Sequence, residues 1–151
     1  MFDSAQMYGN EKEVGAAIHS FLSKNPSIKR EDIFYITKLA SNSGYNRSLK
    51  TLESSFQRCG LDYIDLILIH SPHGGSRARK ESWDALVDAQ KRGWTRSIGV
   101  SNYGVKHLQE MLDKGQKPAV NQVDLHPFMT RTDIVTFCQK NDIALQALRS
   151  S

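Results

Sequence analysis

The sequence is poor in cysteine, with only Cys59 and Cys138 among its 151 residues and no CxxC pair. Two distant cysteines indicate neither a disulfide framework nor a zinc site, and they favour a reducing, cytoplasmic setting. No apolar run approaches the roughly 18 residues that a membrane-spanning helix needs. The first residues are polar and acidic, unlike those of a secretory signal. We therefore expect a soluble cytoplasmic protein with no membrane partner and no bound metal.

A basic block is also missing from the sequence. The 20 Lys and Arg residues are scattered among 16 Asp and Glu residues, so the net charge of +4 gives no reason to expect a nucleic-acid partner. No GxGxxG motif follows any candidate strand, and a Rossmann mode of dinucleotide binding is therefore not supported. With 4 prolines and no linker rich in Pro, Gly or Ser, residues 1–151 indicate a single globular domain.

What the sequence does contain is an alternation of short apolar runs with longer segments of helical periodicity. After a short opening strand that ends near Asp3, strands are predicted at residues 33–37, 63–70, 97–101, 119–126 and 143–148. Helices are predicted at residues 12–24, 48–60, 79–93, 104–115 and 132–141, with a loop that begins at His73 before the third helix. Strands that are apolar almost throughout favour a parallel sheet covered by helices. Both an open doubly wound sheet and a (β/α)8 barrel fit, and both place functional residues at the carboxyl ends of strands.

Side chains suited to acid–base chemistry stand at several of these strand ends, namely Asp3, Tyr8, Lys38 and His70. A phenol is a weak acid, but a nearby ammonium group stabilises the phenolate and lowers the pKa, and a carboxylate can hold the ammonium in place. Tyr8 is thus a candidate proton donor beside Lys38 and Asp3. His70 could hydrogen-bond the carbonyl oxygen of a substrate. Such a group suits carbonyl reduction, for which a cofactor must supply the hydride.

Ser101, Asn102 and Gln122 are the polar residues at the strand ends that follow. They are neutral hydrogen-bonding residues of the kind that a nicotinamide carboxamide needs. Taken singly, each candidate also has a structural explanation, such as a packed tyrosine, a solvated lysine, a structural histidine or a polar turn residue. Their joint placement at strand ends favours the chemical interpretation.

The segments DSAQMYGNEKEVG, YITKL, LILIHSP, IGVSNYGVKHL and VNQVDLHP resemble, in order and spacing, the signatures of the aldo-keto reductase superfamily. The resemblance implies a (β/α)8 barrel that reduces aldehydes and ketones with NADPH, NADH being the alternative, and that works as a cytoplasmic monomer. It also implies a role for each candidate: catalysis by Asp3, Tyr8, Lys38 and His70, substrate contact by Tyr8 and His70, and nicotinamide binding by Ser101, Asn102 and Gln122.

The sequence departs from the family pattern at both ends. It starts where the second barrel strand is expected, and it has ALQALRSS where the family usually continues into AYSPL. The resemblance therefore implies a truncated, partial barrel of about six β/α units, family strands 2–7. Unpaired edge strands of such a barrel favour association between molecules. The alternative to an NADPH-dependent reductase is a catalytically inactive partial barrel that serves as an interaction module or is an unstable isoform.

Overall fold

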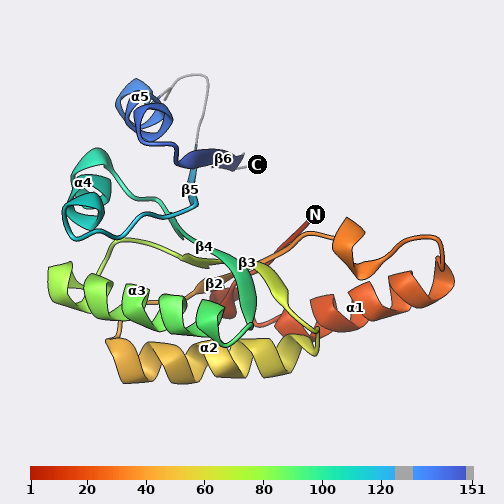
Figure 1. Cartoon of the computed structure of the whole chain (residues 1–151). Helices are drawn as coiled ribbons and strands as arrows, with labels where there is room; N and C mark the ends of the chain where they lie inside the picture. Colours follow the sequence, from red (N-terminus) through yellow and green to blue (C-terminus); the bar gives the residue numbers. More distant parts are fainter. Residues whose placement is uncertain (125–130, 149–151) are drawn as a thin grey trace.

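The computed structural model of the protein describes residues 1–124 and 131–148, and Figure 1 shows their alternation of strands and helices. The strands are β1 (Phe2–Asp3), β2 (Tyr35–Leu39), β3 (Ile64–Ile69), β4 (Thr95–Ser101), β5 (Val120–Asp124) and β6 (Ala144–Leu148). In the described part of the chain they form one 6-stranded sheet, in which every neighbouring pair is parallel. Their Ile-rich and Leu-rich sequences fit strands that are covered on both faces.

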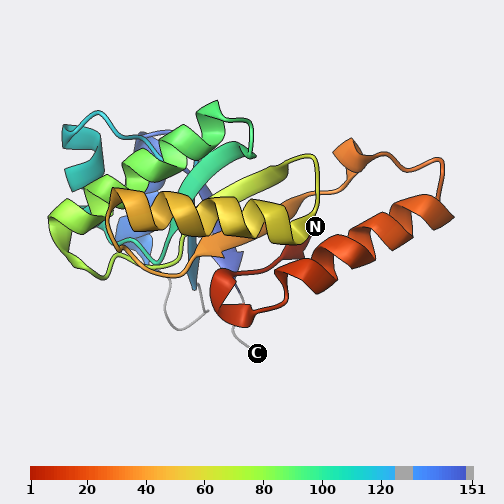
Figure 2. The ribbon, with the colours of Figure 1, turned by 90° about the horizontal axis from the view of Figure 1, so that it is seen from below.

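The strands lie in the sheet in the order in which they occur in the sequence, from β1 to β6. A doubly wound sheet reverses this order at its switch point, whereas a (β/α)8 barrel does not. Figure 1 and Figure 2 show the sheet curling, with helices on its outer side. The predicted partial barrel of β/α units is thereby confirmed, and the doubly wound alternative is excluded.

The helices that connect the strands are α1 (Glu11–Lys24), α2 (Tyr45–Cys59), α3 (Gly75–Lys91), α4 (Val105–Asp113) and α5 (Thr132–Lys140). Short 3-10 turns, η1 (Gln6–Tyr8) and η2 (Arg30–Asp32), follow β1 and precede β2. Between helices and sheet lies the main apolar core, to which Ile18 of α1, Leu52 of α2 and Leu86 of α3 contribute buried side chains. Burial of one apolar face per helix is what the helical periodicity of the sequence predicts.

The inside of the curved sheet has a smaller apolar layer, formed by Ile36, Leu66, Leu68 and Val120. Gly99 faces this layer, because a Cβ there would lie 2.9 Å from the Cδ2 of Leu68. Side chains alternate between the two faces of a strand. The next inside-facing residues, two positions later on β2 and β5, are therefore Lys38 and Gln122. A polar layer at the carboxyl ends of the strands thus lies on an apolar floor.

The predicted starts of two helices are wrong. Helix α2 begins at Tyr45 and not at residue 48, and α3 begins at Gly75, so the predicted loop after His73 is mostly helix. The first turns of α3 lack the apolar spacing from which helices were predicted. They are supported instead by charged side chains, as in the pair between Arg77 and Glu81 at 2.7 Å, one turn apart.

The remaining predicted elements lie within a few residues of the observed ones. The strand predicted at residues 119–126 is observed as Val120–Asp124, and its last two positions lie outside the described residues. None of the helices seen in residues 1–124 and 131–148 combines the length and hydropathy that crossing a membrane requires. In the same ranges, no three His, Cys, Asp or Glu side chains are grouped so that they could hold a metal ion.

Candidate active site

The carboxyl ends of β1 and β2 bring a carboxylate against an ammonium group. The side chain of Lys38 on β2 is only 1% exposed, and its Nζ donates a hydrogen bond to the carboxylate of Asp3 on β1. The same Nζ lies 3.1 Å from the carbonyl oxygen of Ser4. Burying a charged group without partners is costly, so these contacts are what allows Lys38 to lie inside the sheet. They also fix the position of its Nζ.

Tyr8 lies next to this pair, in the η1 turn that follows β1. The Nζ of Lys38 is 5.4 Å from the centroid of the Tyr8 ring. The ring of His70 stands at 87° to that of Tyr8, with 6.1 Å between the two centroids. Tyr8 is 54% exposed, so a molecule can reach it from outside. The structure thus brings together the four residues that sequence analysis selected for catalysis: Asp3, Tyr8, Lys38 and His70.

The η1 turn is held in place by Gln6, which sequence analysis did not select. The Nε2 of Gln6 donates to Ser55 Oγ at 2.9 Å, and its Oε1 accepts from the backbone N–H of Ala40 at 3.0 Å. These bonds tie the turn to α2 and to the end of β2, and they limit the movement of Tyr8 two residues later.

His70 follows β3 directly and is partly buried. Burial lowers the pKa of His70 below its ordinary value, the Lys38 ammonium lowers it further, and the Asp3 carboxylate raises it. The imidazole is therefore uncharged at neutral pH and can donate one hydrogen bond. Its Nδ1 is buried and has no hydrogen-bond partner among the residues that the structure describes.

The junction between β4 and α4 presents Ser101 and Asn102 at the same end of the sheet. Ser101 is buried, and its hydroxyl group donates to the carbonyl oxygen of Gln122 at 3.0 Å. Asn102 has a φ of 59°, in the left-handed region of backbone conformation. Its Nδ2 lies 3.3 Å from the carbonyl oxygen of His70 and 3.3 Å from Ser101 Oγ. The carboxamide of Asn102 is therefore adjacent to the strand end that carries His70.

Gln122 of β5 connects the two groups of candidate residues. Its side chain is fully buried on the inside of the sheet, and its Nε2 lies 2.7 Å from Asp3 Oδ2 and 3.2 Å from Gln146 Oε1. The Oε1 of Gln122 is buried and finds no donor in the described part of the chain. A buried acceptor without a donor is uncommon in folded proteins, so this oxygen is free to accept a further hydrogen bond.

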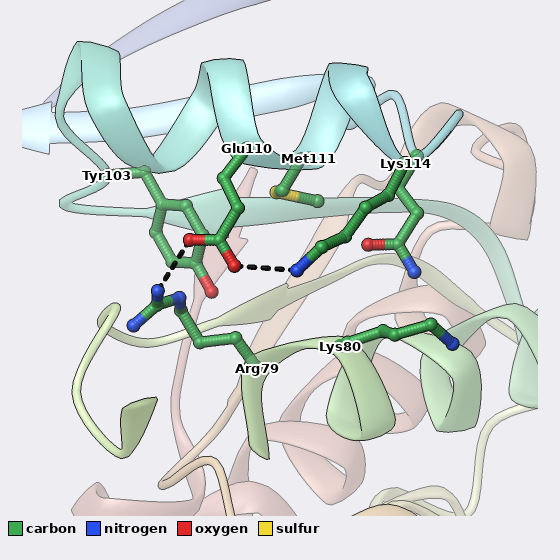
Figure 3. Close-up of a pocket in the computed structure, with 7 residues that line it drawn as sticks. Arg79, Lys80, Tyr103, Glu110, Met111 and Lys114 are labelled. Carbon is green, nitrogen blue, oxygen red and sulfur yellow. Dashed lines mark hydrogen bonds and ion pairs between the residues drawn. The ribbon is translucent and has the colours of Figure 1, made fainter. Parts of the chain in front are cut away.

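A second polar cluster lies outside the curved sheet, between α3 and α4 (Figure 3). Arg79 and Lys114 each donate a hydrogen bond of 2.7 Å to the carboxylate of Glu110. Bonds from Lys114, Ser76 and Arg79 lower the pKa of Glu110 to about 2. The space that these residues leave beside Tyr103 is about 10 Å³, room for roughly one water molecule. This cluster connects two helices and is too small for an organic ligand.

Residues 1–150 match the family model described as the aldo/keto reductase family. An uncharacterized oxidoreductase of Schizosaccharomyces pombe is 47% identical over 147 residues, which are 96% of this chain and 52% of that protein. Glyoxal reductase of Bacillus subtilis is 40% identical, over 96% of this chain and 51% of that protein. The chain thus spans about half the length of the curated relatives it matches.

Solved structures show the same relationship. An aldo/keto reductase from Brucella melitensis has a TM-score of 0.86 and 38% identity, with 97% of this chain and 56% of that chain covered. An aldo-keto reductase from Bombyx mori, solved in complex with NADP, has a TM-score of 0.88 and 32% identity, with 96% and 50% covered. The curled sheet described above therefore corresponds to about half of each of these structures. By sequence and by fold, the chain belongs to the aldo/keto reductase family.

Proposed function

We propose that this chain is an oxidoreductase that reduces small aldehydes or ketones to alcohols with NADPH, acting as one partial-barrel domain. The observation that carries the proposal is the meeting of Tyr8, Lys38 and His70 at the carboxyl ends of β1, β2 and β3. Family membership supports the enzyme class. The name of the Bacillus subtilis relative, glyoxal reductase, supports a small carbonyl compound as the substrate.

In the proposed reaction, Tyr8 gives the proton of its hydroxyl group to the carbonyl oxygen of the substrate. The ammonium group of Lys38, 5.4 Å from the centre of the Tyr8 ring, favours this transfer because it stabilises the negative charge left on the phenol oxygen. Asp3 serves by holding Lys38 in place and by balancing its charge. Exposure of Tyr8 is consistent with direct contact between its hydroxyl group and a substrate.

His70 is proposed to orient the carbonyl group. An uncharged imidazole can donate a hydrogen bond to the carbonyl oxygen without competing with Tyr8 as an acid. The lowered pKa of His70 supports this role, since it keeps the ring uncharged at neutral pH. The short distance between the two rings, 6.1 Å between centroids, supports a common role of His70 and Tyr8 at one carbonyl group.

Bound NADPH would supply the hydride, and the residues that fit its nicotinamide carboxamide are Ser101, Asn102 and Gln122. The unpartnered Oε1 of Gln122 is an acceptor for the amide N–H of the cofactor. The Nδ2 of Asn102 can serve as a donor to the amide oxygen, and the buried Ser101, whose hydroxyl group donates to the carbonyl oxygen of Gln122, holds the strand end beside it. NADPH is preferred to NADH here because the Bombyx mori structure was solved in complex with NADP. Two buried free cysteines, Cys59 and Cys138, are consistent with a reducing compartment such as the cytoplasm.

A fluorescence titration with NADPH tests the proposal. Saturable binding at micromolar cofactor, weakened by Asn102→Ala, is the expected result. Asn46→Ala, which changes an exposed asparagine on α2, serves as the matched control and should bind like the wild type. An unchanged signal up to millimolar NADPH would contradict the proposal and would favour the inactive partial barrel. Substrate turnover is then measured with small aldehydes and ketones by the loss of NADPH absorbance.

A further inference from the structure

The backbone of Asn102 adopts a conformation that needs support from its surroundings. Its φ of 59° lies in the left-handed region, which residues other than glycine seldom occupy, although asparagine does so more readily than most. Such a conformation persists only where neighbouring groups determine it. The backbone N–H of Asn102 donates to the carbonyl oxygen of Gln122 at 2.8 Å. This bond holds the backbone nitrogen of Asn102 against β5.

The next residue of this turn, Tyr103, is held by Asn121. The Nδ2 of Asn121 donates to the carbonyl oxygen of Tyr103 at 2.9 Å, and its Oδ1 lies 3.4 Å from the backbone nitrogen of the same residue. The carboxamide of Asn121 thus contacts both the backbone carbonyl oxygen and the backbone N–H of Tyr103, as a neighbouring strand would. Asn121 is 0% exposed, so water does not compete for these bonds. The ring of Tyr103, 1% exposed, anchors the turn from its other end.

Asn121 and Gln122 are consecutive residues of β5, so their side chains point to opposite faces of the sheet. Gln122 lies on the inside, where it meets Asp3. Asn121 accordingly lies on the helix side, where it meets the core residue Tyr103. A ligand bound on the inside of the sheet by Gln122 and Asn102, as proposed above, would therefore not touch Asn121.

We infer that Asn121 is a positioning residue, which sets the direction of the Asn102 carboxamide by holding the backbone of the next residue. The inference rests on the proposed function, in which Asn102 contacts the nicotinamide carboxamide. Asn121 would act from the face of β5 that is opposite to the proposed binding site. The two neighbouring residues of β5 then have different roles, because Gln122 takes part in binding whereas Asn121 orients the adjacent strand end.

The test compares two ligands, NADP⁺ and its pyridine analogue without the carboxamide, each measured by displacement of NADPH. Asn121→Leu has a similar size but no polar group, and Asn121→Asp keeps one acceptor in case the leucine variant does not fold. We expect either variant to bind NADP⁺ about 3- to 10-fold more weakly, the value of one hydrogen bond, and to bind the analogue within about twofold of the wild type. Equal weakening for both ligands would overturn the inference, because a general structural defect does not distinguish them.

Ser82→Ala is the matched control. It removes a buried polar contact of 3.0 Å with Ser48, between α3 and α2, and should leave both affinities unchanged. Amide hydrogen exchange, measured without any nucleotide, tests the contact itself. Faster exchange confined to Asn102 and Tyr103 in the Asn121 variants supports the inference, and unchanged exchange overturns it. A wild type that binds neither nucleotide contradicts the proposed function, while the exchange measurement still decides whether Asn121 holds the turn.

Discussion

Asp3 and Gln122, which stand 119 positions apart in the sequence, are joined by a hydrogen bond of 2.7 Å across the inside of the sheet. Their strands, β1 and β5, have β2, β3 and β4 between them. In a flat sheet such strands would lie roughly 19 Å apart, at about 4.8 Å per step. The bond therefore requires strong curvature. It also makes one carboxylate the shared partner of Gln122 and Lys38, so the proposed cofactor-binding and proton-donating residues meet at Asp3.

Asp3→Asn should destabilise the fold. The substitution keeps the shape of the side chain but leaves the buried ammonium group of Lys38 without a counter-ion, and we expect the free energy of unfolding to fall by about 2 to 4 kcal/mol. The double variant Asp3→Asn with Lys38→Met should recover most of this loss. Asp142→Asn, in the exposed pair with Lys117, is the control and should change stability by less than about 0.5 kcal/mol. Urea unfolding measures all of them, and equal stability of the Asp3 and Asp142 variants would contradict this account.

Tyr8→Phe should abolish carbonyl reduction without altering the fold. Loss of a proton donor typically costs about 10²- to 10⁴-fold in rate. Tyr8 is 54% exposed, so we expect the far-ultraviolet circular dichroism and the unfolding midpoint to stay unchanged. Tyr45→Phe is the matched control, because it removes a hydroxyl group bonded to Asp88, between α2 and α3. Turnover of the Tyr8 variant equal to that of the Tyr45 variant would remove Tyr8 from its proposed role.

The rule that functional residues follow strands was sufficient to place Tyr8, Lys38 and His70 together. Lys38 and His70 stand at the end of, or directly after, an apolar run, Tyr8 lies in the turn that follows β1, and the carboxyl ends of parallel strands meet at one edge. The sequence alone, by contrast, did not distinguish an open sheet from a barrel. Curvature arises from the packing of the whole sheet, and no single run of residues carries a signal for it.

The supporting residues escaped sequence analysis for a different reason. Gln6 binds Ala40 and Ser55, which lie 34 and 49 positions further along the chain. Asn121 was not selected either, since its partner is the backbone of Tyr103, 18 positions away. A side chain that bonds a distant backbone group leaves no pattern in the sequence. Such residues become visible only when the fold brings their partners together.

Stability should decrease on acidification, in part because of His70. The pKa of His70 is lowered in the folded state, chiefly by burial, so between about pH 6.5 and that lower pKa the unfolded chain binds more protons. Stability therefore rises with pH in this window and is lost as the pH falls through it. His70→Gln removes this contribution, which is at most about 1.4 kcal/mol per pH unit. Urea unfolding between pH 7 and pH 5 should show a shallower loss for the variant, and identical slopes would contradict the assignment.

Gly15→Ala should weaken the contact between α1 and α2. A Cβ at position 15 would lie 1.8 Å from the carbonyl oxygen of Cys59, and this atom belongs to the backbone, so α1 must move away. We expect a loss of about 1 to 3 kcal/mol, although alanine is the better helix former by about 1 kcal/mol.

Ala16→Gly, at the exposed neighbouring position, is the reciprocal control for Gly15→Ala. The free energy of unfolding should fall only by the difference in helix propensity between alanine and glycine, about 1 kcal/mol. If Gly15→Ala proved more stable than the wild type in urea, the close approach of the two helices would be wrong. Because α1 begins three residues after Tyr8, displacement of this helix should also lower turnover more than Ala16→Gly does. Measured together, stability and turnover then show whether helix packing outside the sheet sets the position of the proposed proton donor.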